Sequence, residues 1–398
     1  MERFSQIAAK YHDEIVKTAS EMIQINSQST QEGAMAQYTV DKMKQLGYDE
    51  VVTDRYGNVY GIVHGTGGGS SVTLNCHLDV VYESDHEKWK YPPFSGAVAE
   101  GKIWGRGASD TKGTFAIQLY TPVMLKELGM LPKGDIVVSG VVCEEIAGFG
   151  AMMQTRDRYM LTDYVVIGEA SENDLAISCR GKFCGVVSIK GKSCHASIPH
   201  MGKNPFDLVG PLLCEIGNIP RGYDEKMGYS TITATNVWVS EKGTNIIPNE
   251  VKVFIDYRQV PCDTLEVGVQ KIRDAVERCN KDGFEVDVQP YYFPLTTYTG
   301  FEGEGFQGEY VFSVKETDDH VLLCKNTLEQ VLGREIKTKP WDFATDTGHY
   351  ANSGCKCIGY SPAEIKYCHT TEDCIDIEMM KEAEVGYMAL AYTLGNQE

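Results

Sequence analysis

The chain has 398 residues, of which 42% are apolar and 23% are charged, and its formal net charge is −19. This length exceeds what one hydrophobic core usually serves, so we expect two compact units. The negative charge disfavours nucleic acids and anionic membranes as partners, because both are polyanions and the sequence has no basic patch to offset the repulsion. No segment approaches the roughly 20 consecutive apolar residues that cross a bilayer.

The first residues and the cysteines together predict a cytoplasmic protein. Residues 1–25 alternate charged and apolar side chains at helical spacing and lack the apolar stretch of a secretion signal. Thirteen cysteines, an odd number scattered along the chain, fit reduced thiols better than a disulfide framework. Cys355 and Cys357 stand too far from a second such pair to form a structural zinc knuckle. We therefore expect free thiols and no export.

The first half of the chain alternates predicted strands and helices. Short apolar runs rich in β-branched residues predict strands, and longer periodic segments predict helices. The strands are expected at 72–76, 136–143 and 164–167, and the helices at 34–46 and 114–128. This alternation indicates an α/β unit whose sheet has parallel members, and such sheets bind ligands beyond the carboxyl ends of their strands. The glycine run Gly65 to Gly69 is interpreted as a hairpin loop.

The middle of the chain has a different order of elements. Between residues 182 and 291 we expect a strand, a helix, two strands, a helix and a strand, which is the order of a split βαβ sandwich. A helix at 321–332 and a strand at 357–360 then resume the α/β pattern. The prediction is a catalytic α/β domain with a mixed central sheet, built from residues 1–180 and 293–398. An α+β ferredoxin-like lid, residues 181–292, would be inserted into it.

His77 and Asp79 end the first strand as His-Leu-Asp. The period of two puts both side chains on one side of the strand, where a carboxylate can orient the imidazole of a metal-bound histidine. For this tripeptide alone, a strand-end histidine paired with a neighbouring acid is the preferred interpretation.

Further acids follow the ends of the other strands. Glu144 and Glu145 close the second strand and Glu169 follows the third, while Asp110 lies on the glycine-rich loop 105–113. Two adjacent glutamates, taken alone, usually indicate a solvent-exposed surface. Here four acidic or histidine side chains from three strand ends meet at one edge, and their like charges would repel without a cation. A divalent metal site is therefore predicted, with Asp110 placed to reach it.

Taken in order, these motifs resemble the M20 metallopeptidase family, which includes acetylornithine deacetylases, succinyl-diaminopimelate desuccinylases, aminoacylases and glutamate carboxypeptidases. The similarity covers nearly the whole chain. The chain also resembles a branch of the family that is associated with selenium metabolism, but this association does not indicate a substrate. The motifs that carry it are His77-Leu-Asp79, Gly105-Arg-Gly-Ala-Ser-Asp110-Thr-Lys-Gly113, Glu144-Glu145, Gly168-Glu169 and a late His369.

The resemblance implies a zinc-peptidase-like site with two Zn2+ per chain, although Co2+ or Mn2+ would also suit these ligands. It implies His77 and Glu169 on one ion, Glu145 and His369 on the other, and Asp110 bridging both. Asp79 would orient His77, and Glu144 would be the general base. The family pattern also implies a cis peptide bond after Asp110.

Four lid and loop residues carry weaker expectations. By resemblance, His195 is an oxyanion donor that reaches the active site of a partner subunit, and Asn245 lies near the substrate. Arg258 ends a predicted strand and could hold a substrate carboxylate, but without the resemblance it is an ordinary surface arginine. Asp346 resembles a pocket-side position of variable role, and a helix cap is the simpler interpretation.

We therefore expect a metal-dependent hydrolase that cleaves the amide bond of a small N-acyl amino acid with a two-zinc-activated water. A dipeptidase or carboxypeptidase of the same family is the alternative, so the expected partner is a small acylated amino acid or dipeptide. A homodimer formed through the lid is also expected. A non-catalytic binding protein would show a broken ligand set, and a dinucleotide enzyme would need a helix after the glycine run, which the sequence lacks.

Overall fold

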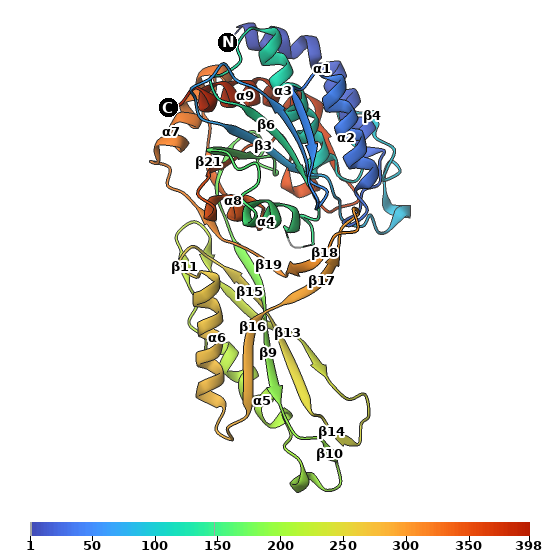
Figure 1. The fold of residues 1–398 in the computed structure, drawn as a ribbon, viewed down its shortest axis with the longest axis vertical. Helices are drawn as coiled ribbons and strands as arrows, with labels where there is room; N and C mark the ends of the chain where they lie inside the picture. The colour runs from blue at the N-terminus through green and yellow to red at the C-terminus, as the bar shows by residue number, and fades with distance from the viewer. Residues whose placement is uncertain (1, 147) are drawn as a thin grey trace.

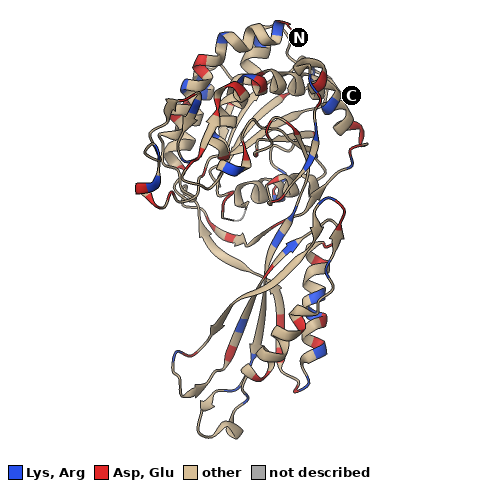
Figure 2. Cartoon of the chain, turned by 180° about the vertical axis from the view of Figure 1, so that it is seen from behind, with Lys and Arg blue, Asp and Glu red and all other residues tan. Residues whose placement is uncertain are grey.

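The computed structural model describes residues 2–146 and 148–398. Figure 1 shows a larger lobe, which holds both chain termini, and a smaller elongated lobe that projects from it. Acidic and basic residues are interspersed along the chain in both lobes (Figure 2). Across the described residues, no helix combines the length and the apolar character needed to cross a membrane.

A mixed sheet forms the centre of the larger lobe. Its strands are β1 (Glu50–Thr53), β2 (Val59–Val63), β3 (Val72–His77), β6 (Ile136–Val141), β7 (Tyr164–Ile167), β8 (Leu175–Cys179), β20 (Phe312–Ser313), β21 (Thr338–Trp341) and β22 (Lys356–Gly359). They lie in the order β1-β2-β6-β3-β7-β22-β8-β20, with β21 paired to β8. The central strands β6, β3, β7 and β22 run in parallel, β2 is antiparallel to β6, and β1 is antiparallel to β2.

Helices cover both faces of this sheet. One face carries α3 (Gly113–Glu127) and α9 (Ile377–Gly395), and the other carries α4 (Phe149–Arg156) and α8 (Thr347–Asn352). The remaining long helices are α1 (Glu2–Ile23), α2 (Gly33–Gln45) and α7 (Asp319–Leu332). Val166 belongs to the core under α3 and α9, while its neighbours Val165 and Ile167 belong to the core under α8. Neighbouring strand residues face opposite sides, so a sheet covered twice requires the continuous apolar runs seen in the sequence.

The smaller lobe is the α+β ferredoxin-like unit that was expected. It consists of β9 (Gly181–Lys190), α5 (Phe206–Gly217), β13 (Thr231–Val239), β15 (Glu250–Gln259), α6 (Leu265–Cys279) and β16 (Glu285–Pro290). The strands form an antiparallel sheet in the order β13-β15-β9-β16. The helices α5 and α6 pack together against this sheet around a separate core that includes Val187, Ile255 and Ile272.

Short strands connect the lobes or lie at their edges. β17 (Tyr292–Thr296) and β18 (Glu302–Phe306) form an antiparallel pair at the junction, and β19 (Gly308–Glu309) then pairs with β9 (Figure 1). The others are β4 (Ala97–Ala99), β5 (Lys102–Trp104), β10 (Cys194–His195), β11 (Tyr223–Asp224), β12 (Gly228–Tyr229), β14 (Ile246–Ile247) and β23 (Cys374–Asp376). The insertion of residues 181–292 as a domain stays a proposal, and pairing with the smaller lobe continues to Glu309.

The prediction of a hairpin at Gly65 to Gly69 is wrong. This loop leads from β2 to β3, but β6 lies between these two strands in the sheet, so they do not pair. The glycines allow close packing instead. A Cβ on Gly65 would lie 2.3 Å from the carbonyl oxygen of Gly134, and one on Gly69 would lie 2.3 Å from that of Gly395.

Candidate active site

Three neighbouring parallel strands bring histidine and acidic side chains to one edge of the central sheet. His77 ends β3, Glu144 and Glu145 follow β6, and Glu169 follows β7. The carboxyl ends of adjacent parallel strands meet at the same edge, so these side chains converge. β6 ends at Val141, earlier than predicted, and the two glutamates therefore lie on the loop that follows the strand.

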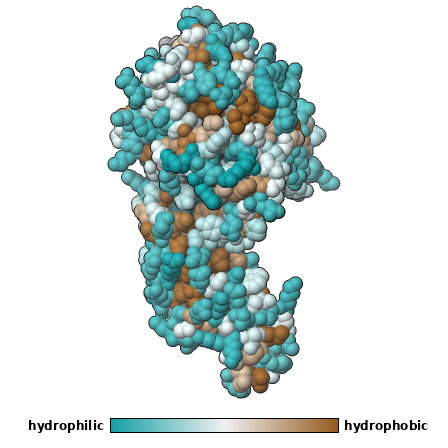
Figure 3. Space-filling model, viewed as in Figure 1, coloured by the Kyte–Doolittle hydropathy of each residue, from teal (hydrophilic) through white to brown (hydrophobic). Residues whose placement is uncertain are grey.

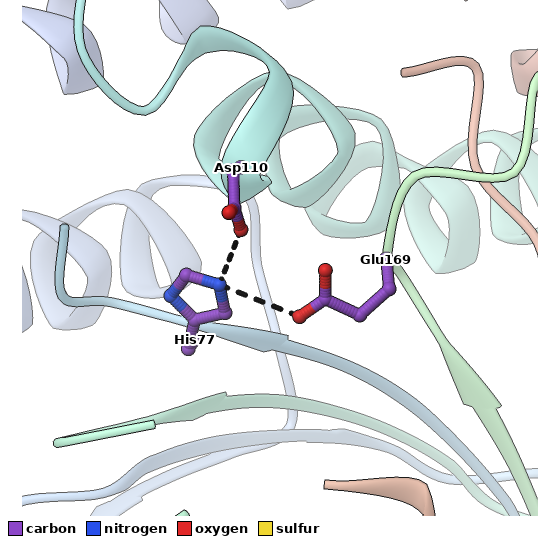
Figure 4. A group of neighbouring side chains, drawn as sticks. All are labelled: His77, Asp110 and Glu169. Atoms are coloured by element: carbon purple, nitrogen blue, oxygen red, sulfur yellow. Dashed lines mark hydrogen bonds and ion pairs between the residues drawn. The ribbon is translucent and has the colours of Figure 1, made fainter. Parts of the chain in front are cut away.

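The imidazole of His77 is buried, and both of its nitrogens have partners. Nε2 lies 2.7 Å from Oδ1 of Asp110 and 3.5 Å from Oε1 of Glu169, and Figure 4 shows both carboxylates turned toward it. Nδ1 lies 2.9 Å from the backbone carbonyl oxygen of Asp79. A proton on Nδ1, donated to that carbonyl, leaves the lone pair of Nε2 facing the carboxylates, which is the orientation of a metal-binding histidine.

Asp79 orients its neighbours differently from the expectation. Its Oδ1 lies 3.7 Å from Nδ1 of His77, beyond hydrogen-bond distance, so the backbone carbonyl of Asp79 is the partner of the imidazole. The carboxylate instead accepts the backbone N–H groups of Glu144 at 3.0 Å and of Glu145 at 3.1 Å. The side chain of Asp79 therefore positions the glutamate loop, because the turn after β6 directs its N–H groups toward this carboxylate.

Asp110 lies at the centre of the cluster. It occupies a turn, residues Ala108–Lys112, directly before α3, and the peptide bond from Asp110 to Thr111 is cis, as the resemblance implied. Oδ1 of Asp110 faces His77, while Oδ2 lies 3.0 Å from Nε2 of His369. His369 in turn lies 3.1 Å from Oε1 of Glu145. The two oxygens of Asp110 therefore face two different histidines.

A buried ion pair fixes the turn that carries Asp110. Asp373 accepts the backbone N–H groups of Gly107 at 2.8 Å and of Ser109 at 2.9 Å, and its Oδ2 lies 3.1 Å from Nη1 of Arg106. Both charged side chains are almost fully buried. The sequence interpretation missed Asp373. The one signal in the sequence was its position a few residues after His369, because its burial and its contact with the turn are visible only in the structure.

The cluster concentrates negative charge in a buried place. Burial, followed by repulsion from Asp110, raises the pKa of Glu169 to about 7. Burial and the neighbouring acids raise the pKa of Glu145 as well, and burial together with Glu309 raises that of Glu144 well above its usual range. Carboxylates gathered in this way are stabilised in the charged form only by compensating cations.

The donor atoms fit divalent metal ions. Two groups of His and carboxylate atoms, each with members within 4.8 Å of one another, share Asp110: one joins it to His77 and Glu169, the other to Glu145 and His369. A third such group contains His77, Glu144 and Glu145. Imidazole nitrogens and carboxylate oxygens are the ligands that zinc and related ions take in proteins. The same atoms without an ion would leave several acids buried against each other.

His195 and Asn245 do not join this cluster within one chain. Both are exposed and lie at the β10 and β14 end of the smaller lobe, the end furthest from the larger lobe (Figure 1). Nδ1 of His195 accepts a hydrogen bond from the backbone N–H of Ser197 at 3.1 Å and lies 2.8 Å from its hydroxyl. A role for either residue at the site requires a second copy of the chain.

Arg258 does reach the cluster. It lines a cavity of about 190 Å³ together with the side chains of Asp110, Glu144, Glu145, Glu169 and His369. Lys182, at the start of β9, lines the same cavity, and the sequence interpretation missed it. Strand pairing places Lys182 directly opposite Arg258. That register is a tertiary property, so the spacing of the two residues along the chain gave no signal.

Asp346 is buried beside the site but does not cap a helix. It precedes α8, yet its side chain accepts no capping hydrogen bond. Its Oδ1 has no hydrogen-bond partner among the described residues, and the same holds for Nε2 of the adjacent His349. The cap interpretation is therefore wrong, because the carboxylate turns toward Gly148 rather than toward the first turn of α8.

Comparisons with known proteins identify relatives of this chain. The chain is 26% identical over 376 residues to the Escherichia coli (strain K12) protein "Uncharacterized protein YgeY", covering 92% of this chain and 91% of that one. It is 29% identical over 315 residues to a probable succinyl-diaminopimelate desuccinylase of Staphylococcus epidermidis, covering 71% of this chain and 76% of the relative.

A solved structure shares the whole fold. The Bacillus subtilis YXEP protein, described as a dinuclear metal binding peptidase, matches with a TM-score of 0.70 at 12% identity, covering 98% of this chain and all of that one, 100%. Residues 73–393 match the family described as peptidase family M20/M25/M40. That span includes every member of the His and carboxylate cluster, from His77 to His369. The chain therefore belongs to peptidase family M20/M25/M40, and it is a metal-dependent hydrolase of that family.

Proposed function

We propose that the protein is a deacylase that hydrolyses the amide bond of a small N-acyl amino acid with the help of two zinc ions. The observation that carries the proposal is the position of Asp110, which lines one small cavity and whose Oδ1 faces His77 while its Oδ2 faces His369. A carboxylate in this position is the natural bridge between two ions. The Bacillus subtilis protein of the same fold is described as dinuclear, which supports two ions over one.

The ligand assignment follows the two groups that share Asp110. His77 and Glu169 would hold one ion, Glu145 and His369 the other, with Asp110 between them. A pair of metal ions held by these residues would supply Lewis-acid polarisation of the scissile carbonyl and would lower the pKa of a bound water molecule. Zinc suits this set of nitrogen and oxygen donors, and cobalt or manganese would also be accepted.

Glu144 is the proposed general base. Its carboxyl group is buried, lines the cavity and has no assignment as a ligand in either group that shares Asp110. It would take a proton from the attacking water as the water oxygen bonds to the carbonyl carbon. When the carbon–nitrogen bond breaks, Glu144 would return that proton to the leaving amine. Asp79 holds the backbone of Glu144 in place for this transfer.

Arg258 is the proposed anchor for the carboxylate of the substrate. Nε of Arg258 donates to Asp256 at 2.8 Å, and this bond directs the guanidinium while its terminal N–H groups stay available to a carboxylate. Arg258 belongs to the smaller lobe and the acids belong to the larger lobe. Movement of the smaller lobe as a lid would close the cavity around the substrate and exclude water.

A homodimer formed through the smaller lobe would complete the site. The end of that lobe carries exposed apolar side chains, visible in Figure 3 and including Ile198, Met201 and Ile246. Trp238 on the neighbouring edge strand β13 is also exposed. A second copy packed there would cover these side chains and would bring its His195 toward the substrate as an oxyanion donor.

All thirteen cysteines carry free thiols, which supports a reducing compartment such as the cytoplasm.

The similarity to a desuccinylase supports a deacylase as the first candidate. The desuccinylase of Staphylococcus epidermidis removes an acyl group according to its name, and it is 29% identical to this chain. Solved peptidases of the same fold, such as the Bacillus subtilis protein, are at most 20% identical among those compared, and they support the fold. A dipeptidase or carboxypeptidase of the same family is the second candidate, because an amide between two amino acids presents the same bond and carboxylate.

Amine release from a panel of substrates tests the proposal. The panel contains N-acetyl and N-succinyl amino acids, dipeptides and acylated diamines, with zinc-loaded, cobalt-loaded and chelator-treated protein. Metal-dependent release from the N-acyl amino acids is expected. Release from dipeptides alone would replace the deacylase with the second candidate. No release from any compound by protein that holds two metals would overturn the proposal.

A further inference from the structure

The base of the smaller lobe carries a transverse row of charged side chains. In the antiparallel pair of β9 and β15, Lys182 lies directly opposite Arg258, and in the pair of β9 and β19, it lies directly opposite Glu309. Residues opposite each other on adjacent strands point to the same face, with Cβ atoms about 4.5–5.5 Å apart. Glu309, Lys182 and Arg258 therefore form one row on one face of the sheet. Figure 2 shows basic positions on the strands just below the larger lobe.

The carboxylate of Glu309 holds the ammonium group of Lys182 in place and keeps it charged. Nζ of Lys182 lies 2.7 Å from Oε1 of Glu309, which is buried. Burial lowers the pKa of Lys182, but the nearby carboxylates of Glu309 and Glu144 outweigh it and the pKa rises, so the ammonium group stays charged. An ammonium group has three donors, and Glu309 accepts from one of them. The others are available toward the cavity that Lys182 lines.

The two cations occupy the same side of the cavity. Lys182 and Arg258 come from the smaller lobe, while the lining acids Asp110, Glu144, Glu145 and Glu169 come from the larger lobe. A bound substrate would place its scissile amide against the acids and their metal ions, and its anionic end against the cations. A single carboxylate needs one bidentate arginine. A second cation one strand away matches a second carboxylate on the same end of the substrate.

We infer that Lys182 and Arg258 form a two-cation subsite that selects N-acyl derivatives of an acidic amino acid, aspartate or glutamate. Arg258 binds the α-carboxylate and Lys182 binds the side-chain carboxylate. The close spacing of the two cations requires both carboxylates on the amine side of the scissile bond, which distinguishes this class from acyl groups that carry their own carboxylate, such as succinyl. The inference rests on the proposed function and names its substrate class.

Binding measurements test the inference independently of hydrolysis. Calorimetry on the zinc-loaded Glu144→Gln variant compares three ligands of similar size: N-acetylglutamate, its neutral isostere N-acetylglutamine, and N-succinylglycine, which carries its second carboxylate on the acyl side. N-acetylglutamate is expected to bind roughly tenfold more tightly than either, the size of one additional charge-assisted hydrogen bond.

Substitution of the lysine identifies the source of this preference. In the same background, Lys182→Met should lose the tenfold preference for N-acetylglutamate while N-acetylglutamine binds as before. Lys182→Met leaves Glu309 buried without a partner, so a Lys182→Met/Glu309→Gln variant removes both charges and should give the same loss. The matched control is Lys190→Met, at the exposed far end of β9, where Lys190 lies opposite Glu250 and Glu285. This control should retain the full preference.

Three results would overturn the inference. They are equal binding of N-acetylglutamate and N-acetylglutamine by the Glu144→Gln protein, tighter binding of N-succinylglycine, and an equal loss for all three ligands in both Lys182 variants. Failure of the proposed function has a different signature. The wild-type protein would then bind N-acetylglutamate selectively and release no amine from it.

Discussion

Asp373 and Arg106 form an almost fully buried ion pair, with 3.1 Å between Oδ2 and Nη1, at the base of the turn that presents Asp110. We expect Asp373→Ala to lower the free energy of unfolding by about 3–5 kcal/mol, because the guanidinium of Arg106 would stay buried without its partner. Two backbone N–H groups would also lose their acceptor. Urea unfolding measures the change.

The exposed pair of Lys90 and Glu100 provides the control for this prediction. Glu100→Gln should leave the unfolding curve unchanged, since exposed ion pairs contribute little. If Asp373→Ala unfolds at the same urea concentration as the wild-type protein, the pair does not hold the turn.

Asp110→Asn should abolish the binding of both metal ions, because one carboxylate serves both ligand groups. His369→Ala removes a ligand from one group only and should reduce the metal content from two ions per chain to one. Elemental analysis after dialysis against zinc measures both. Retention of two ions by Asp110→Asn would show that Asp110 does not bridge them.

Glu144→Ala should reduce kcat by about 10²–10⁴ while both metal ions stay bound, since proton transfer by a positioned base contributes this factor. Stopped assays of amine release, with metal content measured on the same sample, separate this effect from ligand loss. As a control, Glu304→Gln removes an exposed carboxylate on β18 and should leave kcat unchanged. Full turnover by metal-loaded Glu144→Ala would remove Glu144 from the mechanism.

Mixing two inactive variants tests the role of the dimer. His195→Ala and Glu144→Ala homodimers should both be inactive or nearly so. A mixed dimer has one intact site, formed by Glu144 of the first chain and His195 of the second, so activity should return after the two proteins are mixed and allowed to exchange subunits. A monomer in light scattering, or no recovery after proven exchange, would contradict the dimer.

The stability contributed by Asp263 should depend on pH. Burial raises the pKa of this carboxyl, but hydrogen bonds from Lys271 at 2.6 Å and Tyr257 at 2.8 Å outweigh it, and the pKa in the folded protein lies below the usual value. A lowered folded pKa stabilises the fold above the unfolded pKa of about 3.9, and this contribution is lost as the pH falls through the folded pKa.

Urea unfolding of the wild-type protein and Asp263→Asn at several pH values measures this dependence. The difference in the free energy of unfolding should be constant near neutrality and should shrink below about pH 4. A difference that is the same at pH 7 and at pH 3 would show that the charge of Asp263 is not involved.

Most of the cluster could be predicted from the sequence, because apolar runs show where the parallel strands end and the cluster residues lie at those ends. His77 and Glu169 follow such runs directly, and the order of elements in the smaller lobe was also readable from periodicity. Two classes of feature were not readable. The Lys182–Arg258 pairing depends on the register of two strands, and the bond between Asp79 and the glutamate loop depends on the path of a turn. Both arise from tertiary structure, which single-sequence patterns do not encode.

The pairing of β19 with β9 has a mechanical consequence. Besides the covalent connections, a strand that follows the β17–β18 pair is hydrogen-bonded to the first residues of the smaller lobe, and this ladder includes Lys182. If the smaller lobe rotates, the axis would lie near this hydrogen-bonded base. Residues at the base would then move least, and residues at the β10 and β14 end would move most. Lys182 and Arg258 lie near this base. If the smaller lobe closes as proposed, they would stay close to the anionic end of the substrate throughout, and His195 would move the furthest.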